Sequence, residues 1–207
     1  MSADLLLALG AFAFVSSITP GPNNLMLMAS GTNFGLRRTL PHAFGVGFGF
    51  VLMLVLIGLG LARVFDAVPA SYLVLKTASA AYLLYLAWKI AHASPPPAET
   101  DQDTDARPFS FLQAAAFQWV NPKAWAMALT AISVYTLPAR PLHTLAIVAL
   151  VFGLVNLPCI LSWTILGTQL RHLLDNPVRL RAFNITAALL LVATLWPILT
   201  SGGLALH

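Results

Sequence analysis

Two short polar clusters interrupt long apolar stretches of this sequence: Thr19–Asn24 (TPGPNN) and Asn121–Lys123 (NPK). Proline lacks a backbone donor and its ring clashes with the carbonyl four residues earlier, so each cluster is expected to open a helix. In an apolar environment the freed backbone groups need partners from protein, water or substrate, and asparagine supplies both donors and acceptors. The residues predicted to bind a substrate are Pro20, Gly21, Pro22, Asn23, Asn24, Asn121, Pro122 and Lys123.

Proline in a transmembrane helix often marks only a kink, and a single proline would favour that simpler interpretation. Here the two clusters fall at similar depths. Pro20 lies about 16 residues into the first predicted helix and Pro122 about 12 residues into the fourth, counted from opposite sides at roughly 1.5 Å per residue. The pairing favours a site between two broken helices over two unrelated kinks.

Lysine in an apolar stretch is a second signal, because a charge near the bilayer centre costs about 2.5–3.5 kcal/mol. Lys123 lies mid-stretch, too deep to reach the interface easily, and is expected to face a cavity and attract a carboxylate. Lys76 is about eight residues from the outer end of its stretch, where an interfacial lysine and a pathway residue are equally good explanations.

No Asp or Glu lies deep in an apolar stretch, so a proton relay would have to use His42, a lysine or the substrate itself. Asn156 is a further pathway or coupling candidate. It shares its stretch with Pro158, Ser162 and Trp163, and lining a pathway or hydrogen-bonding between helices explains these polar residues equally well.

The composition indicates a membrane protein. Only 9% of the 207 residues are charged, 58% are hydrophobic and the mean hydropathy is +0.81, whereas a soluble domain carries roughly a quarter charged residues. Stretches of about 20 apolar residues match the thickness of a bilayer and are too long and continuous for membrane strands. The predicted helices are Leu5–Met28, Leu40–Ala62, Val68–Ile90, Phe111–Val134, Leu142–Thr168 and Ala182–Thr200.

Lysine and arginine outside the stretches predict the orientation. One side carries Arg63 and Arg140, and the other carries Arg37, Arg38, Lys89, Arg107, Arg171, Arg179 and Arg181. The positive-inside rule places the second side in the cytoplasm and both termini outside. The scattered basic residues thus reflect membrane orientation rather than nucleic-acid binding. We expect a multi-pass protein of the bacterial inner membrane.

A polar segment divides the chain into a first half (1–91), an acidic cytoplasmic linker (92–110) and a second half (111–207) within one transmembrane domain. Three helices per half imply opposite topologies, so the expected fold is all-α, with six transmembrane helices as two inverted repeats. The linker carries Glu99, Asp101, Asp103 and Asp105, but a calcium loop also needs a glycine and a closing glutamate. No metal or other cofactor is expected.

Gly45 and Gly49 form a small-x-x-x-small face that allows another helix to approach closely. Packing within the chain is the simpler explanation, and homodimerisation through this face is the alternative.

Several segments resemble the LysE/RhtB family of amino-acid exporters: Thr19–Asn24, Gly35–Arg38, Ala80–Lys89 and Asn121–Lys123. The resemblance implies secondary export of amino acids or close derivatives, driven by the proton gradient. Residues 130–138 and 87–91 are most similar to the cysteine/O-acetylserine exporter branch. Many members carry an acidic residue where this chain has Asn156, which places the coupling step in question.

The function expected is export of an amino acid from the cytoplasm, with lipid as the other partner; another small solute or cation is the alternative. A membrane redox carrier needs a cysteine pair, and Cys159 is the only cysteine. An intramembrane enzyme is not expected, because no catalytic grouping of Ser, His and Asp and no metal motif is present. A passive channel would need a ring of like charge or a filter loop.

Overall fold

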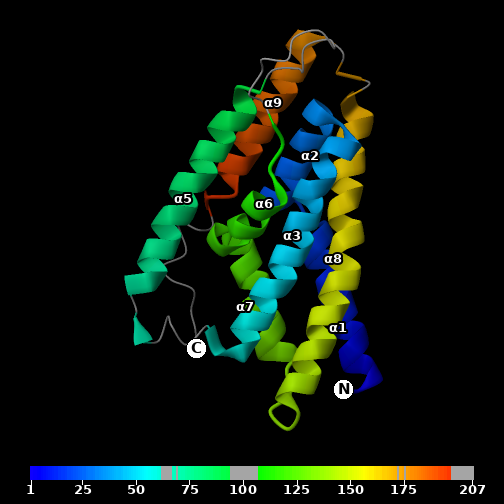
Figure 1. Ribbon diagram of the computed structural model, residues 1–207, viewed down its shortest axis with the longest axis vertical. Helices are drawn as coiled ribbons and strands as arrows, with labels where there is room; N and C mark the ends of the chain where they lie inside the picture. Colours follow the sequence, from blue (N-terminus) through cyan, green and yellow to red (C-terminus); the bar gives the residue numbers. More distant parts are fainter. Residues whose placement is uncertain (62–66, 69, 94–106, 172, 175, 197–207) are drawn as a thin grey trace.

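The structure, a computed structural model, describes residues 1–61, 67–68, 70–93, 107–171, 173–174 and 176–196. All regular elements in these residues are helices, arranged as an elongated bundle (Figure 1). The elements are α1 (Ala3–Ile18), α2 (Pro22–Phe34), α3 (Leu36–Leu56), the π-helical turn η1 (Ile57–Leu61), α5 (Ala70–Ala91), α6 (Phe111–Phe117), the 3-10 turn η2 (Gln118–Val120), α7 (Pro122–Tyr135), α8 (Pro141–Arg171) and α9 (Pro177–Ala193).

Both predicted helix breaks are confirmed. α1 ends at Ile18, and α2 begins at Pro22 after a bend of 51°. In the second half the chain passes through η2 and an extended Asn121 before α7 begins at Pro122. In each case proline occupies the first turn of the new helix, where its missing N–H would have had no helical partner.

Three predicted boundaries were wrong by more than a turn. The second stretch was predicted to begin at Leu40, but α3 begins at Leu36. The first stretch was predicted to end at Met28, but α2 continues to Phe34 because it lies against α8, and Gly35 ends it with a φ of 78°. The last stretch was predicted to begin at Ala182, but α9 begins at Pro177. The Asn176 side chain caps this helix by accepting from the Val178 amide. Thr200 lies outside the described residues.

Three helices in the described part of the chain are long and apolar enough to cross a membrane: Leu36–Leu61, Leu73–Ala91 and Pro141–Arg171. The bent pair α1–α2 is a fourth span if it is counted as one. α6, α7 and α9 have 7, 14 and 17 residues and are each shorter than these spans, so the six transmembrane helices and the inverted repeat stay predictions.

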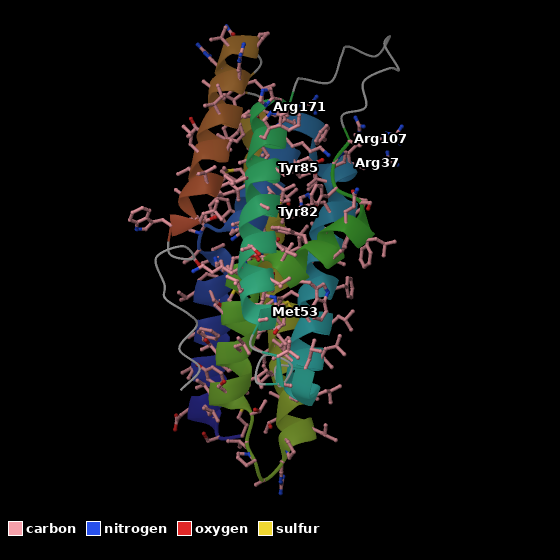
Figure 2. The ribbon with its side chains drawn as sticks, turned by 90° about the vertical axis from the view of Figure 1, so that its left-hand side faces the viewer. Arg37, Met53, Tyr82, Tyr85, Arg107 and Arg171 are labelled. Atoms are coloured by element: carbon pink, nitrogen blue, oxygen red, sulfur yellow. The ribbon has the colours of Figure 1, made fainter. Side chains whose placement is uncertain are left out.

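The basic residues gather at one end of the bundle. Arg37, Arg107 and Arg171 lie at the upper end in Figure 2, where α2 joins α3 and α8 leads to α9 (Figure 1). Arg140 lies in the connection from α7 to α8 at the opposite end, together with the start of α1. Arg63 lies outside the described residues. The predicted charge asymmetry therefore follows the long axis of the described bundle.

The two halves of the chain pack into each other. α2 lies along α8, where the Thr32 hydroxyl donates to the Gly167 carbonyl at 2.9 Å. Asn33 and Asn184 exchange side-chain hydrogen bonds of 2.9 and 3.2 Å between α2 and α9. The buried apolar residues of the described bundle form three clusters, and each cluster contains residues from both halves.

Gly45 and Gly49 bring α3 against α6. A Cβ at Gly45 would overlap the Phe111 carbonyl oxygen, and one at Gly49 would lie 2.6 Å from the Ala115 Cα. This face is thus filled within the chain, which agrees with the simpler prediction and leaves no room there for a second copy.

Replacing Gly45 with alanine will lower the stability of the protein. The new methyl group meets backbone rather than a flexible side chain, and overpacking of this kind costs about 1–3 kcal/mol. Gly10→Ala is the matched control, because a Cβ there meets nothing within 4 Å. Thermal unfolding in lipid nanodiscs checks the pair, and equal Tm values for both variants would contradict the close packing.

Candidate functional site

Asn24 satisfies carbonyl groups that the first break frees. Its side-chain amide donates to the Ser17 and Thr19 carbonyl oxygens, both at 2.8 Å. The residue is 4% exposed, so these bonds form inside the protein. Because an unpaired buried carbonyl would cost about 1–3 kcal/mol, Asn24 stabilises the unwound turn between α1 and α2.

Lys123 joins the two breaks. Its ammonium donates to the Thr19 carbonyl at 2.7 Å, to the Thr19 hydroxyl at 2.9 Å and more weakly to the Pro20 carbonyl at 3.4 Å. The side chain lies over Gly21, where an added Cβ would stand 2.6 Å from the Lys123 Cδ. The expectation that the clusters in the two halves meet is confirmed by these contacts.

A second link between the breaks comes from a residue outside the predicted set. Asn23 and Gln118 exchange side-chain hydrogen bonds of 2.8 and 3.3 Å, and Gln118 is completely buried. The Gln118 amide also donates to the Ala114 carbonyl at 2.8 Å. Its sequence signal is a glutamine inside an apolar stretch, five residues after Gln113 and three residues before Asn121.

The two new helices differ at their N-termini. The Asn121 side chain caps α7 by accepting from the Lys123 amide at 3.1 Å. α2 begins after Gly21, and no side chain caps it. The N-terminus of α2 therefore offers backbone amides and the positive end of a helix dipole beside the Lys123 ammonium. This combination suits an anionic group such as a carboxylate.

A cavity of about 30 Å³ lies between the breaks, which is room for roughly two water molecules. It is lined by Ser16, Ser17, Gly21, Asn23, Asn24, Phe50, Asn121, Lys123, Ala124, Met127, Asn156 and Ile160. Among these residues the Ser17 hydroxyl and the Asn156 Oδ1 are buried without a hydrogen-bond partner in the described structure. Two polar atoms are thus open to a ligand or water in this small cavity.

The polar residues of α8 were predicted either to line a pathway or to form hydrogen bonds between helices, and α8 contains residues of both kinds. Asn156 lines the small cavity. Trp163 instead bonds between helices, because its indole N–H donates to the Ile18 carbonyl at 2.9 Å at the end of α1. Ser162 donates to the Cys159 carbonyl within α8. Trp163 thus satisfies a backbone carbonyl at the first break, one of the two roles that the sequence left open.

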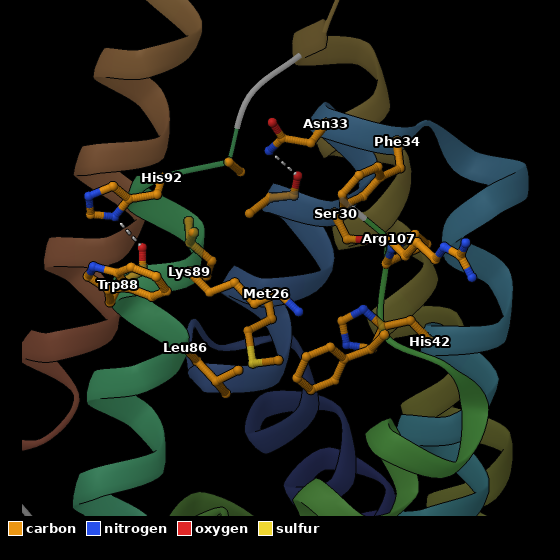
Figure 3. Close-up of a pocket in the computed structure, with 15 residues that line it drawn as sticks. Met26, Ser30, Asn33, Phe34, His42, Leu86, Trp88, Lys89, His92 and Arg107 are labelled. Carbon is orange, nitrogen blue, oxygen red and sulfur yellow. Dashed lines mark hydrogen bonds between the residues drawn. The ribbon is translucent and has the colours of Figure 1, made fainter. Parts of the chain in front are cut away.

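His42 and Lys76 are not brought to the breaks. His42 lines a larger cavity of about 420 Å³ toward the basic end of the bundle (Figure 3). Lys76 belongs to α5 and lines neither cavity. Within the described ranges no three His, Cys, Asp or Glu side chains are grouped to hold a metal ion, and the predicted linker acids lie outside those ranges.

Comparison with known proteins places this sequence in a family. Residues 14–195 match the model of the LysE type translocator family. The chain is 34% identical over 198 residues to the cysteine/O-acetylserine efflux proteins of Escherichia coli (strain K12) and Shigella sonnei (strain Ss046), covering 93% of this chain and 96% of each relative. No solved structure matches it significantly. The family match spans most of the chain, so this protein belongs to the LysE type translocators.

Proposed function

We propose that the protein exports amino acids or close derivatives from the cytoplasm, with cysteine and O-acetylserine as first candidates. The relatives named as efflux proteins for these compounds support this substrate class. The observation that carries the proposal is the Lys123 ammonium beside the uncapped N-terminus of α2. A translocator that moves a zwitterion needs such an anion site next to acceptors for an ammonium group.

In this proposal the substrate carboxylate binds Lys123 and the first backbone amides of α2. The ammonium of Lys123 has three donors, and its 3.4 Å contact with the Pro20 carbonyl is the weakest of its bonds. A carboxylate can replace that contact at little cost. Charge-assisted hydrogen bonds of this kind are roughly twice as strong as neutral ones.

The substrate ammonium binds the Ser17 hydroxyl and the Asn156 Oδ1. The sequence suggested freed carbonyls with Asn24 or Asn121 for this role. The freed carbonyls of Ser17 and Thr19 already accept from the Asn24 side chain, and the Asn121 Oδ1 accepts from the Lys123 backbone amide. Ser17 and Asn156 hold the unpartnered acceptors in the small cavity, so they fit the ammonium better.

The small cavity is closed to an amino acid in the described conformation, since it holds about two waters. Transport therefore requires the two halves to move apart around the breaks, as in carriers that alternate access by rocking one repeat against the other. The proposed architecture is six spans in two inverted halves of an inner-membrane protein. The basic end lies in the cytoplasm and both termini lie outside.

We further propose that the proton gradient drives export. No Asp or Glu is among the described lining residues of the small cavity, and Asn156 stands where an acid could have carried the proton. The proton would then travel with the substrate or through Lys123. Measuring export at several external pH values with the membrane potential clamped tests this step separately from substrate choice.

Cells that overproduce the protein provide the test of the export function. The expected result is a several-fold higher concentration of cysteine or O-acetylserine outside the cells than in vector controls, with no change in synthesis. Equal external concentrations, from protein shown to be inserted in the membrane, would contradict amino-acid export for these substrates.

Gly21→Ala will reduce export by about tenfold or more without unfolding the protein. The new methyl group meets the flexible Lys123 side chain, which can swing away but then loses its bonds at Thr19; losing a bond to a charged group costs about 1.5–3 kcal/mol. Export rate and Tm are measured together, with Gly10→Ala as the control in open space. Unchanged export would mean that the position of Lys123 does not matter.

A further inference from the structure

The larger cavity of about 420 Å³ is lined by α2, α3, α5 and the segment that leads into α6. It shares no lining residue with the small cavity at the breaks. Its volume falls in the range of about 300–1,000 Å³ that is typical of small-molecule sites. Figure 3 shows Met26 and Leu86 at its lower side and Phe34 at its upper side, so much of the wall is apolar.

His42 is an unsatisfied polar group in this wall. It is 2% exposed, and neither ring nitrogen has a hydrogen-bond partner in the described structure. The imidazole packs against the Phe109 ring at 5.2 Å between centroids. Buried side-chain polar atoms are nearly always hydrogen-bonded, and each unpaired one costs about 1–3 kcal/mol. A ligand in the cavity would supply the missing partner.

The charged residues among the described lining of this cavity are cations. Lys89 and Arg107 line it, and no Asp or Glu is among its described lining residues. In Figure 3 the Lys89 side chain extends from α5 toward His42, and its Nζ lies 5.8 Å from the centre of the Phe109 ring. The cation and the imidazole N–H donor can meet one anionic group together.

Three further polar residues of the wall, Asn33, Ser30 and His92, have hydrogen-bond partners within the protein, and the His92 Nδ1 lies 2.8 Å from the Trp88 carbonyl oxygen. The Asn33 side chain bonds to the Ala29 carbonyl and to Asn184. The Ser30 hydroxyl pairs with the Thr39 hydroxyl at 3.0 Å. A ligand ammonium would therefore find two cations and few open acceptors in the described wall. This environment favours a ligand with a carboxylate but without a free amino group.

We propose that the larger cavity is a separate binding site for a small organic carboxylate with an apolar body, such as an amino acid whose amino group is acylated. The carboxylate contacts Lys89 and the His42 N–H. The apolar body packs on Met26, Leu86 and Phe109. Because it differs in its chemistry from the zwitterion site at the breaks, it does not depend on the proposed export substrate.

Calorimetric titration of the full-length protein in lipid nanodiscs tests this site with three matched probes: N-acetyl-L-leucine, L-leucine and N-acetyl-L-leucine amide. The first should bind. In Lys123→Met, which lacks the proposed zwitterion site, the other two should bind at least about tenfold more weakly than the first, because one adds an ammonium and the other removes the carboxylate. Lys89→Met and His42→Phe should each weaken the first probe by about tenfold.

Two control variants keep the test specific. Arg179→Gln removes a basic residue near the same end that does not line the cavity, and Lys123→Met removes the cation at the breaks. Both should leave binding of N-acetyl-L-leucine unchanged. Lys89 is exposed, so Lys89→Met remains informative if His42→Phe does not fold. Equal binding of all three probes to Lys123→Met, no binding of the first, or its loss in Lys123→Met would overturn the proposal.

Discussion

Replacing Lys123 with methionine will reduce amino-acid export to the background rate while the protein remains in the membrane. Methionine keeps most of the length of the side chain but removes the ammonium that bonds at Thr19 and faces the α2 N-terminus. The loss of a charge-assisted hydrogen bond to the substrate corresponds to a decrease of about 10- to 100-fold in the affinity for substrate. Transport in proteoliposomes at several substrate concentrations measures this decrease in export.

Lys76→Met is the matched control, since this second lysine within an apolar stretch lines neither cavity. It should export at close to the normal rate. Lys123 also caps the end of α1, so Tm must be measured for both variants. A Lys123→Met protein that exports normally would refute the carboxylate site. A Lys123→Met protein with a lower Tm but normal export per folded molecule would mean that Lys123 only stabilises the end of α1.

Asn156→Leu will weaken substrate affinity by about 10- to 100-fold, with a smaller effect on the stability of the protein. Leucine is similar in shape but lacks the Oδ1 that has no partner in the small cavity. The substrate ammonium would then lose one of its two proposed acceptors, at a cost of about 1.5–3 kcal/mol. The substrate dependence of transport separates this loss of affinity from a loss of folded protein.

Ser162→Ala on the same helix is the control, because the Ser162 hydroxyl donates only to the Cys159 carbonyl within α8. Its affinity for substrate should be unchanged. If Asn156→Leu transports with unchanged affinity, the unpartnered Oδ1 is occupied by water alone, and the ammonium must bind elsewhere at the breaks.

The helix breaks could be predicted from sequence because proline acts locally. Pro22 and Pro122 cannot donate within a helix, so each sets a boundary whatever surrounds it. The start of α9 was missed although Asn176 and Pro177 form a cap and first turn, because the prediction followed the apolar stretch rather than the capping residues.

The partners across the breaks could not be predicted in the same way. The hydrogen bonds of Gln118 with Asn23 and of Trp163 with Ile18 follow only from the placement of η2 and α8 against the first break. The bonds that Asn24 makes to freed carbonyls also depend on the unwound geometry of residues 19–21. The sequence thus predicted the two clusters that meet, whereas tertiary packing decides which polar atoms beside them have no hydrogen-bond partner.

The most direct test of amino-acid export is uptake by everted membrane vesicles with an imposed pH gradient. Labelled cysteine, O-acetylserine, threonine, leucine and lysine form the panel. The proposal predicts uptake of one or a few of them, lost when the gradient is dissipated and lost in Lys123→Met. No uptake of any amino acid by folded, inserted protein would contradict amino-acid export and leave another solute as the substrate of this LysE type translocator.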